Sequence, residues 1–366
     1  MRVLHVEAGK HLYGGAKQVV YLLSGLKQQG IESLLVCPTG SAVAGAAREV
    51  GVAVEELPMG GDLDLALIFR LRQSIKRYGP DIVHVHSRRG ADLMGGVAAR
   101  MCGIKSVLSR RVDNPQQRLV VALKYALYDR VVAISQGIAD VLRKEGVAEQ
   151  KLRCVRSAVD VGHYQQPCDK AWFREQFGLR DGALVMGVIA QLIPRKGHRY
   201  LLKAMPKLIR AFPQLQLMIF GKGALREELE QQIEALQLQP HVTQAGFRDD
   251  LPRILPCLDL LVHPALMEGL GVSLLQAASA GLPIVAVDAG GMPEAVEHGV
   301  NGLLVPGGSV EALAEALHQL LDDASLRQRM GEAGREKMRL EFSVEQMVSG
   351  NLTVYRDLLG TDEVIG

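Results

Sequence analysis

Several features that define large classes of protein are missing from this sequence. No apolar run approaches the roughly 20 residues that a membrane-spanning helix requires, and aromatic residues form only 4% of the chain. Because the basic residues also form no long run, a nucleic-acid-binding protein is disfavoured. The first residues contain only a short apolar run, which Glu7 interrupts, so we expect no signal peptide.

Cysteine is scarce as well. The five cysteines are scattered, odd in number and never in CxxC spacing: Cys37, Cys102, Cys154, Cys168 and Cys257. This pattern predicts buried thiols in a reducing cytoplasm, and neither disulfides nor a zinc site. The GxGxxG sequence is also absent, and no acidic residue stands where a nicotinamide cofactor needs one, so a Rossmann-type dehydrogenase is disfavoured.

The size and charge of the chain bear on its organisation. At 366 residues it is long enough for two domains of about 150 residues each. Residues 1–165 contain 23 Lys and Arg against 15 Asp and Glu, a net charge of +8, whereas the remainder has a net charge of −6. The basic first half indicates an anionic partner, such as a phosphorylated glycan or an anionic membrane surface. Ordinary variation in surface composition explains the same numbers equally well.

Short apolar segments alternate with amphipathic segments along the chain. In the first half the strand-like segments are 2–8, 31–37, 81–87, 105–110, 129–135 and 151–157. In the second half they are 183–191, 215–221, 241–246, 259–264, 282–288 and 301–306. Apolar strands that alternate with helices predict parallel sheets covered on both faces. After Pro306 the pattern is helical almost to the end of the chain.

We therefore predict an α/β protein with two doubly wound, Rossmann-like domains that face each other across a central cleft. The alternation lapses between Asp160 and Lys170, where Pro167 interrupts it, and this marks the domain boundary. In such sheets ligands bind beyond the carboxyl ends of the strands. The polar residues that follow the strands are therefore the candidates for a site.

Two groups of candidates follow strands of the first half. Gly14 and Gly15 open the first helix, where backbone N–H groups can face an anion, although glycines also serve such turns for their conformation alone. His84 and His86 share one face of a strand. Since no third ligand is evident nearby, a substrate hydrogen bond from His86 is favoured over metal binding, and His84 is expected to be a satisfied core histidine. Four arginines at neighbouring strand ends are consistent with either a cluster or a solvated rim: Arg88, Arg89, Arg110 and Arg111.

Two turns of the second half carry basic residues. Arg195 and Lys196 adjoin Gly197 between a strand and a helix, where two cations are well placed to hold a diphosphate. Gly221 and Lys222 belong to a Gly-x-Gly turn after the next strand. Each turn is equally consistent with exposed basic residues on a loop.

The most informative stretch is MEGLGVSLLQ. The N–H groups of Gly271, Val272 and Ser273 are expected at a helix N-terminus, ready for a phosphate. Glu268 can accept hydrogen bonds from hydroxyl groups, and Gln276 faces roughly the same side from the first turns of the helix. A diphosphate with a hydroxylated group at each end fits this layout better than a bare phosphate.

On these motifs the sequence resembles the retaining glycosyltransferases of family 4, which have the GT-B fold. The resemblance covers almost the whole chain and includes GGAKQVVYLLSGL, PDIVHVHS, VVAISQGIADVL, LIPRKGH, FGKGALREELE and HPALMEGLGVSLLQAASAGLPIVAVDAGGMPEAVEHGVNGLLVP. It implies that the last helix packs back on the first domain. The expected domains are then 1–162, completed by the helix 343–366, and 163–342.

The resemblance implies retaining transfer of a sugar from a nucleotide-sugar donor to a glycan or glycolipid acceptor, with no cofactor and no essential metal. Synthesis of lipopolysaccharide or another cell-surface polysaccharide fits the basic first half. The protein is then expected in the cytoplasm or peripherally on the inner face of the cytoplasmic membrane. The catalytic residues implied are Glu268, Arg195, Lys196 and His86. The donor-binding residues implied are Gly14, Gly15, Gly221, Lys222, Phe247, Arg248, Gly269, Leu270, Gly271, Val272, Ser273 and Gln276, and the acceptor-side candidates are Arg88, Arg89, Arg110 and Arg111.

The sequence departs from the family pattern at four positions. Gln276 replaces the second acid of the E-x7-E motif, Gln191 stands where Arg is common, and Lys17 and Lys222 replace acids of two glycine turns. An amide can still accept a hydrogen bond from a ribose hydroxyl, so an active enzyme is expected. Two alternatives stay open: a catalytically degenerate sugar-nucleotide-binding protein, and a GT-B-like sugar-nucleotide epimerase, for which no convincing acid–base pair is evident.

Overall fold

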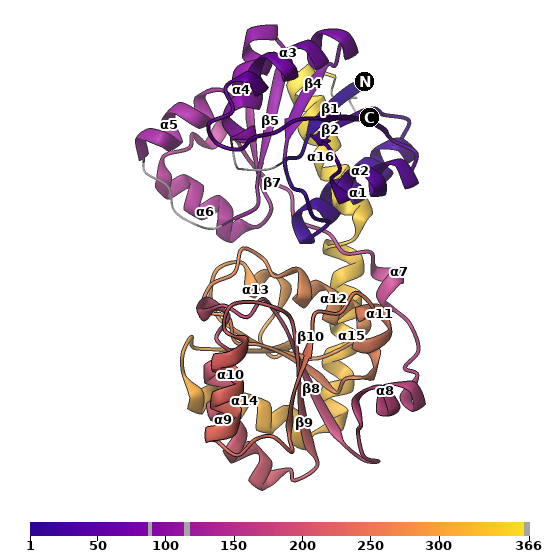
Figure 1. Ribbon diagram of the computed structural model, residues 1–366, viewed down its shortest axis with the longest axis vertical. Helices are drawn as coiled ribbons and strands as arrows, with labels where there is room; N and C mark the ends of the chain where they lie inside the picture. Colours follow the sequence, from indigo (N-terminus) through magenta and orange to yellow (C-terminus); the bar gives the residue numbers. More distant parts are fainter. Residues whose placement is uncertain (87–89, 113–117, 362–366) are drawn as a thin grey trace. The chain divides into compact units, whose positions relative to one another are not determined.

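The chain divides into two compact units in a computed structural model that describes residues 1–86, 90–112 and 118–361 (Figure 1). Unit 1 consists of Met1–Ala158 with Val344–Gly366, and unit 2 is Val159–Ser343. The sequence predicts these divisions after residues 162 and 342 instead. No helix among the described residues is both long and apolar enough to cross a membrane.

Unit 1 is built on a parallel sheet in the order β3-β2-β1-β4-β5-β6-β7. Its strands are β1 (Arg2–Val6), β2 (Glu32–Pro38), β3 (Ala53–Leu57), β4 (Ile82–Val85), β5 (Lys105–Arg110), β6 (Arg130–Ala133) and β7 (Leu152–Cys154). The inner strands are apolar and buried almost throughout, because helices cover both faces of a parallel sheet.

Helices pack on both faces of this sheet. On one face lie α1 (Gly14–Gln28), α2 (Ala42–Glu49) and α16 (Val344–Leu359). On the other lie α3 (Ala66–Tyr78), α4 (Ala91–Cys102), α5 (Arg118–Ala126) and α6 (Gln136–Glu145). Side chains alternate between the faces, so Leu4 packs toward α3–α6, whereas Val3 packs toward α1 and α16. The C-terminal helix thus completes the core of the N-terminal unit (yellow among the indigo and magenta elements of Figure 1).

Unit 2 repeats this architecture with a parallel sheet in the order β10-β9-β8-β11-β12-β13. Its strands are β8 (Leu184–Ile189), β9 (Leu215–Phe220), β10 (Val242–Gly246), β11 (Leu260–His263), β12 (Ile284–Val287) and β13 (Gly302–Val305). Its helices are α7 (Val161–Tyr164), α8 (Lys170–Phe177), α9 (His198–Ala211), α10 (Arg226–Ala235), α11 (Leu251–Ile254), α12 (Val272–Ala280), α13 (Met292–Ala295), α14 (Val310–Asp322) and α15 (Ala324–Glu341). Short 3-10 turns are η1 (Glu149–Lys151) in unit 1 and η2 (Pro194–Lys196) and η3 (Leu255–Cys257) in unit 2.

One strand is absent from the sequence-based prediction. Strand β3 has the sequence AVEEL and lies at the edge of the sheet, paired only with β2. Its residues are half-buried or exposed, and Glu55 and Glu56 sit in its centre. An edge strand tolerates such charged residues because one of its sides remains open to solvent.

The cysteine prediction is wrong in two respects. Cys168 and Cys257 form a disulfide across a sequence separation of 89 residues. Beside it, Asp169 accepts a hydrogen bond of 2.7 Å from Arg253. Of the remaining cysteines only Cys37 is buried, whereas Cys154 is exposed. The disulfide went unpredicted because it depends on the meeting of η3 with the segment just before α8, and the sequence does not reveal that these two segments are close.

Candidate active site

The central feature of unit 2 is an ion pair at the carboxyl edge of its sheet. Glu268 lies in the loop between β11 and α12, and Lys196 lies in η2, after β8. The Lys196 ammonium contacts Oε2 of Glu268, and the two side chains are only 10% and 17% exposed. Strands β8 and β11 are neighbours in the sheet, so parallel pairing brings their carboxyl ends together.

Glycines allow the loops of this site to pack backbone against backbone. A Cβ on Gly197, whose φ is +72°, would lie 1.9 Å from the carbonyl oxygen of Pro264. A Cβ on Gly290 would lie 2.2 Å from the carbonyl oxygen of Glu268. Backbone bonds join the same loops, from Leu266 N–H to the Arg195 carbonyl at 2.8 Å and from Gly291 N–H to the Glu268 carbonyl at 2.9 Å. The position of Glu268 is therefore fixed through its own backbone.

The carboxylate of Glu268 is held in its ionised form. Burial by itself would raise its pKa, but the polar contact with His263 and the charge of Lys196 outweigh burial and lower the pKa to about 2. A carboxylate at neutral pH accepts hydrogen bonds and donates none. Glu268 is therefore suited to bind hydroxyl groups.

The glycine-rich turn opens α12 as the sequence predicts. Gly271 caps the helix with a φ of +85°, and α12 begins at Val272, so the free N–H groups of the first turn include those of Val272 and Ser273. Gly269 and Leu270 are buried beneath them. Such a helix N-terminus is a ready site for an anion.

Gln276 lies in the same helix, and its amide nitrogen donates a bond of 2.7 Å to the hydroxyl of Tyr164 in α7. A glutamate at this position has no proton to donate, so it would have to accept from Tyr164 instead. The amide at residue 276 thus sets the direction of this bond.

The other donor-binding candidates of unit 2 follow the neighbouring strands. Arg195 is exposed in η2. Gly221 follows β9 with its backbone against Ala190, since a Cβ there would lie 1.9 Å from the Ala190 carbonyl oxygen. After β10, the exposed ring of Phe247 lies 5.0 Å from the Lys222 ammonium, and Arg248 bonds to Asp250 at 2.8 Å. All of these positions lie at the carboxyl edge of the unit 2 sheet.

The carboxyl edge of the unit 1 sheet carries a different set of groups. Helix α1 begins at Gly14, and a Cβ on Gly15 would contact Arg111 at 3.6 Å. Arg110 is buried at the end of β5 and donates to the carbonyl of Val112 at 2.7 Å. The candidates Arg88 and Arg89 lie outside the described residues.

A cluster of three buried imidazoles lies in unit 1. His5 of β1 is in register with His84 of β4, so the two side chains share a face, and His86 lies two residues farther along that face. The ring nitrogens of the three histidines lie within 4.8 Å of one another. His84 bonds to Tyr355 at 2.6 Å and to Ser109 at 2.8 Å, and is the satisfied core histidine that the sequence predicts. His5 is the third imidazole of the cluster. The sequence gives no sign that it lies beside His86, because its position depends on the pairing of β1 with β4.

The hydrogen bonds of this cluster fix its tautomers. Burial lowers the pKa of His5 to about 3 and that of His86 well below its usual value, so both rings are neutral. Arg111 can only donate, and its guanidinium lies 3.5 Å from Nδ1 of His86. His86 therefore carries its proton on Nε2 and donates to Nδ1 of His5 at 2.9 Å. A metal ion would have to displace these bonds and would lie beside the Arg111 cation, so a hydrogen-bonded cluster fits the residues better than a metal centre does.

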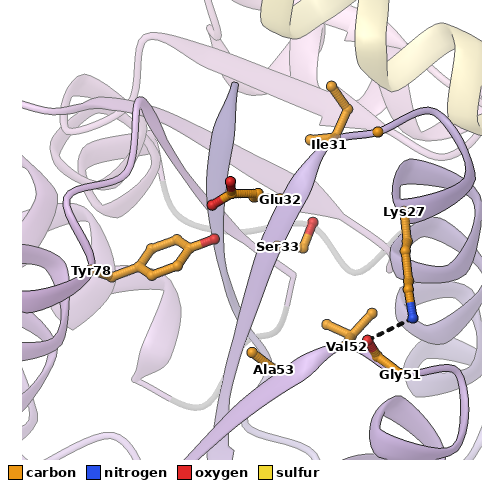
Figure 2. Close-up of a pocket in the computed structure, with 9 residues that line it drawn as sticks. Lys27, Ile31, Glu32, Ser33, Gly51, Val52, Ala53 and Tyr78 are labelled. Atoms are coloured by element: carbon orange, nitrogen blue, oxygen red, sulfur yellow. Dashed lines mark hydrogen bonds between the residues drawn. The ribbon is translucent and has the colours of Figure 1, made fainter.

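A separate surface hollow of about 380 Å³ lies at the other edge of the unit 1 sheet (Figure 2). It is lined by Glu32 and Ser33 at the start of β2, by Ala53 at the start of β3, and by Lys27 and Tyr78. Lys27 spans part of it and donates to the Gly51 carbonyl at 2.8 Å. The hollow contains none of the residues that the sequence predicts for the site.

Comparison with known proteins gives both units the same assignment. Residues 13–163 match the family model described as Glycosyltransferase Family 4, and residues 169–337 match the one described as Glycosyl transferases group 1. The chain is therefore a glycosyltransferase, with one family domain in each unit. Its two Rossmann-like units have the GT-B fold, which its structural neighbours share.

Two characterised relatives illustrate the range of the family. The 2-deoxystreptamine glucosyltransferase of Streptomyces kanamyceticus is 28% identical over 309 residues, which are 78% of this chain and 80% of the relative. A GDP-mannose-dependent monoacylated alpha-(1-6)-phosphatidylinositol monomannoside mannosyltransferase of Corynebacterium glutamicum is 37% identical over 202 residues, 52% of each chain.

Among solved structures, Alr3699/HepE of Anabaena in complex with UDP superposes with a TM-score of 0.86 at 21% identity and covers 98% of this chain and 100% of its own. A glycosyltransferase from Rickettsia africae ESF-5 superposes with a TM-score of 0.89 at 18% identity, covering 99% of both chains. At these identities the likeness shows a shared fold and nothing more specific.

Proposed function

We propose that this protein is a retaining glycosyltransferase of family 4 that transfers a sugar from a nucleotide-sugar donor to a glycan or glycolipid acceptor. The observation that carries the proposal is the ion pair of Glu268 and Lys196 beside the N-terminus of α12. Groups for a sugar, for a diphosphate and for a ribose then follow one another along a single edge of the sheet.

The roles follow from charge and position. Lys196 and Arg195, with the N–H groups of the first turn of α12, stabilise the negative charge that develops on the departing diphosphate. Glu268 accepts hydrogen bonds from the hydroxyls of the donor sugar. Gln276 binds the ribose, and Phe247 and Arg248 frame the base. In unit 1, the N-terminus of α1 at Gly14 and Gly15 is proposed to bind an anionic group, whereas both ring nitrogens of His86 already have partners in the buried cluster.

We further propose that turnover requires no metal ion. The two cationic side chains and the helix N-terminus supply the positive charge that a divalent ion supplies in other transferases. Turnover is then unchanged by EDTA and is not increased by Mg²⁺ or Mn²⁺. An activity that EDTA abolishes and Mn²⁺ restores would refute this part of the proposal.

The acceptor is proposed to be a cell-surface glycan or glycolipid, such as lipopolysaccharide, glycosylated at the inner face of the cytoplasmic membrane. The basic first half of the chain fits an anionic acceptor or surface. Leu63, Leu65 and Phe69, beside and within α3, are 93%, 65% and 64% exposed and offer apolar contacts for a membrane. Sedimentation with vesicles of anionic phospholipid, compared with neutral vesicles, tests the association.

Donor screening tests the whole proposal. Purified protein is incubated with UDP-, GDP- and ADP-sugars, and both the melting temperature and the release of the nucleoside diphosphate are measured. At least one donor should raise the melting temperature and be hydrolysed slowly or transferred. The proposal fails if no donor of the panel does either.

A second candidate, a donor-binding protein without turnover, is favoured by one observation. The amide of Gln276 is already bonded to Tyr164, whereas the family motif has an acid at this position. This candidate predicts that a donor raises the melting temperature but is never consumed. Turnover that first appears in Gln276→Glu would support it, and turnover by the wild-type protein would exclude it.

A further inference from the structure

A buried histidine lies behind the carboxylate of Glu268. His263 is the last residue of β11 and is 1% exposed. Its Nε2 lies 3.5 Å from Oε2 of Glu268, a polar contact longer than a regular hydrogen bond, and neither ring nitrogen of His263 has a hydrogen-bond partner among the described residues. The Lys196 ammonium contacts the same oxygen. Among the described residues both polar contacts of the carboxylate fall on Oε2, which leaves Oε1 for another partner.

The ring of His263 is a neutral donor. Burial lowers its pKa, an effect larger than the opposing influence of Glu268, so the imidazole carries one proton at neutral pH. The carboxylate can only accept, which places this proton on Nε2. Nδ1 then needs no acceptor, and the Nε2 proton is the one that faces Glu268.

We propose that His263 is a positioning residue for Glu268, an inference that rests on the proposed transfer of a sugar from a nucleotide donor. His263 holds Oε2, so that Oε1 faces the donor sugar and accepts from its hydroxyls. It also keeps the carboxylate oriented when the Lys196 ammonium turns from Glu268 to the diphosphate. Of the two groups that contact Glu268, Lys196 is charged and His263 is neutral. The diphosphate therefore competes with Glu268 for Lys196 and not for His263.

A second buried histidine provides a matched control. His198, the first residue of α9, is 3% exposed, and neither of its ring nitrogens has a partner among the described residues. Burial lowers its pKa to about 4, with the nearby His263 and Lys196 as further causes. His198 thus shares the burial and neighbourhood of His263, but the structure gives it no contact with Glu268.

The experiment separates the sugar from the rest of the donor. Calorimetry measures binding of UDP-glucose and UDP, and of GDP-mannose and GDP, to the wild-type protein and to His263→Gln, His263→Phe and His198→Phe. In the pair that the wild type binds, His263→Phe should weaken binding of the nucleotide sugar by about tenfold and leave binding of the nucleoside diphosphate unchanged, since a polar contact with a charged group is lost. His263→Gln keeps an N–H donor and should restore most of the difference.

Two results would overturn the inference. One is an equal loss of affinity for the nucleotide sugar and for the nucleoside diphosphate in His263→Phe. The other is a loss of affinity for the nucleotide sugar alone in His198→Phe. Both would mean that the ring only fills the core.

A ligand-free measurement keeps this failure distinct from failure of the proposed function. In a double-mutant cycle on unfolding, His263→Phe and Glu268→Ala should be non-additive, whereas His198→Phe and Glu268→Ala should add. Additivity of the first pair overturns the contact itself. If the first pair is non-additive but the wild type neither binds nor consumes any nucleotide sugar, the sugar-orienting role falls together with the proposed function.

Discussion

The two units share a strand order but differ in what surrounds the histidine at the end of a central strand. His86 follows β4 of unit 1, and His263 ends β11, the corresponding strand of unit 2. The partners of His86 are another imidazole and a guanidinium. The partner of His263 is a carboxylate that also binds Lys196.

This difference shows how one architecture supports two kinds of chemistry. In unit 1 the groups around His86 are neutral rings that bond to each other and to Tyr355, with one guanidinium beside them, so they build a rigid polar core. In unit 2 the buried groups bear opposite charges at a helix N-terminus, so they can exchange partners with a charged ligand. Removing a charge in unit 2 should therefore lower the rate of transfer, whereas removing a hydrogen bond in unit 1 should lower the stability of that unit.

The largest effect is expected from removing the charge in unit 2. Glu268→Gln keeps the shape of the side chain but loses the carboxylate that Lys196 and His263 contact. Transfer should fall by about 100-fold or more in kcat, because the lost interactions are preorganised for the donor sugar. Steady-state kinetics with the best donor measures it.

The matched control for Glu268→Gln is Glu311→Gln, which removes an exposed acid in the first turn of α14. It should leave kcat within twofold or so of the wild type. A wild-type rate in Glu268→Gln would remove Glu268 from the site.

A smaller effect, on stability, is expected from the disulfide, which also belongs to unit 2 alone. Replacing Cys168 and Cys257 by Ser should lower the free energy of unfolding of unit 2 by about 2–4 kcal/mol, since the closed loop is long. The sole tryptophan, Trp172 of α8, reports this unit, with the Arg253 guanidinium 3.8 Å above its ring. The unfolding transition in urea, followed by tryptophan fluorescence, should shift to lower urea concentration. An equal shift in the unfolding of unit 1 would contradict the conclusion that the disulfide stabilises unit 2 alone.

Much of the fold was readable from the sequence because the inner strands are buried on both faces. Apolar runs such as those of β4 and β11 stand out from the amphipathic helices between them. Strand β3 did not, since its Glu55 and Glu56 belong to an edge. The boundary segment was visible as a lapse in the alternation, but its cysteine gave no sign of its partner in η3.

The candidate site was readable only in part. Glu268, Lys196 and the glycine turn follow strand ends, where the general rule for parallel sheets places ligands. His5 was missed because its position beside His86 depends on the register of β1 and β4. His263 was missed because a histidine within an apolar strand gives no indication of the side chain that it faces. The VHP sequence before the Glu268 loop is the signal that was available.

A smaller loss of stability than that from the disulfide is expected when the rigid polar core of unit 1 loses a hydrogen bond. Tyr355→Phe removes the hydroxyl that bonds to Nδ1 of His84 and leaves that nitrogen buried without a partner. Unfolding of unit 1 should become easier by about 1–2 kcal/mol. The unfolding transition in urea that is followed by far-UV circular dichroism should shift to lower urea concentration, whereas the transition followed by Trp172 fluorescence should not shift. Tyr200→Phe, which loses only an exposed bond from Arg199, is the control, and an equal shift there would contradict this account.

The smallest effect for a single residue is a pH dependence that both units share. Burial lowers the pKa of His5 from 6.5 to about 3 and that of His198 to about 4. Below pH 6.5 the unfolded chain binds protons that these folded rings refuse, so the folded state loses stability until the pH reaches the folded pKa. Each ring should cost about 1 kcal/mol between pH 7 and pH 5.5.

Replacing one ring measures its share of this loss. His5→Phe should flatten the pH dependence seen by circular dichroism, and His198→Phe that seen by tryptophan fluorescence. Unit 1 has three histidines with a lowered pKa, namely His5, His84 and His86, against two in unit 2. Unit 1 should therefore lose stability more steeply on acidification. The opposite order would mean that the imidazole cluster accepts a proton while folded, and that its neutral hydrogen-bond pattern is wrong.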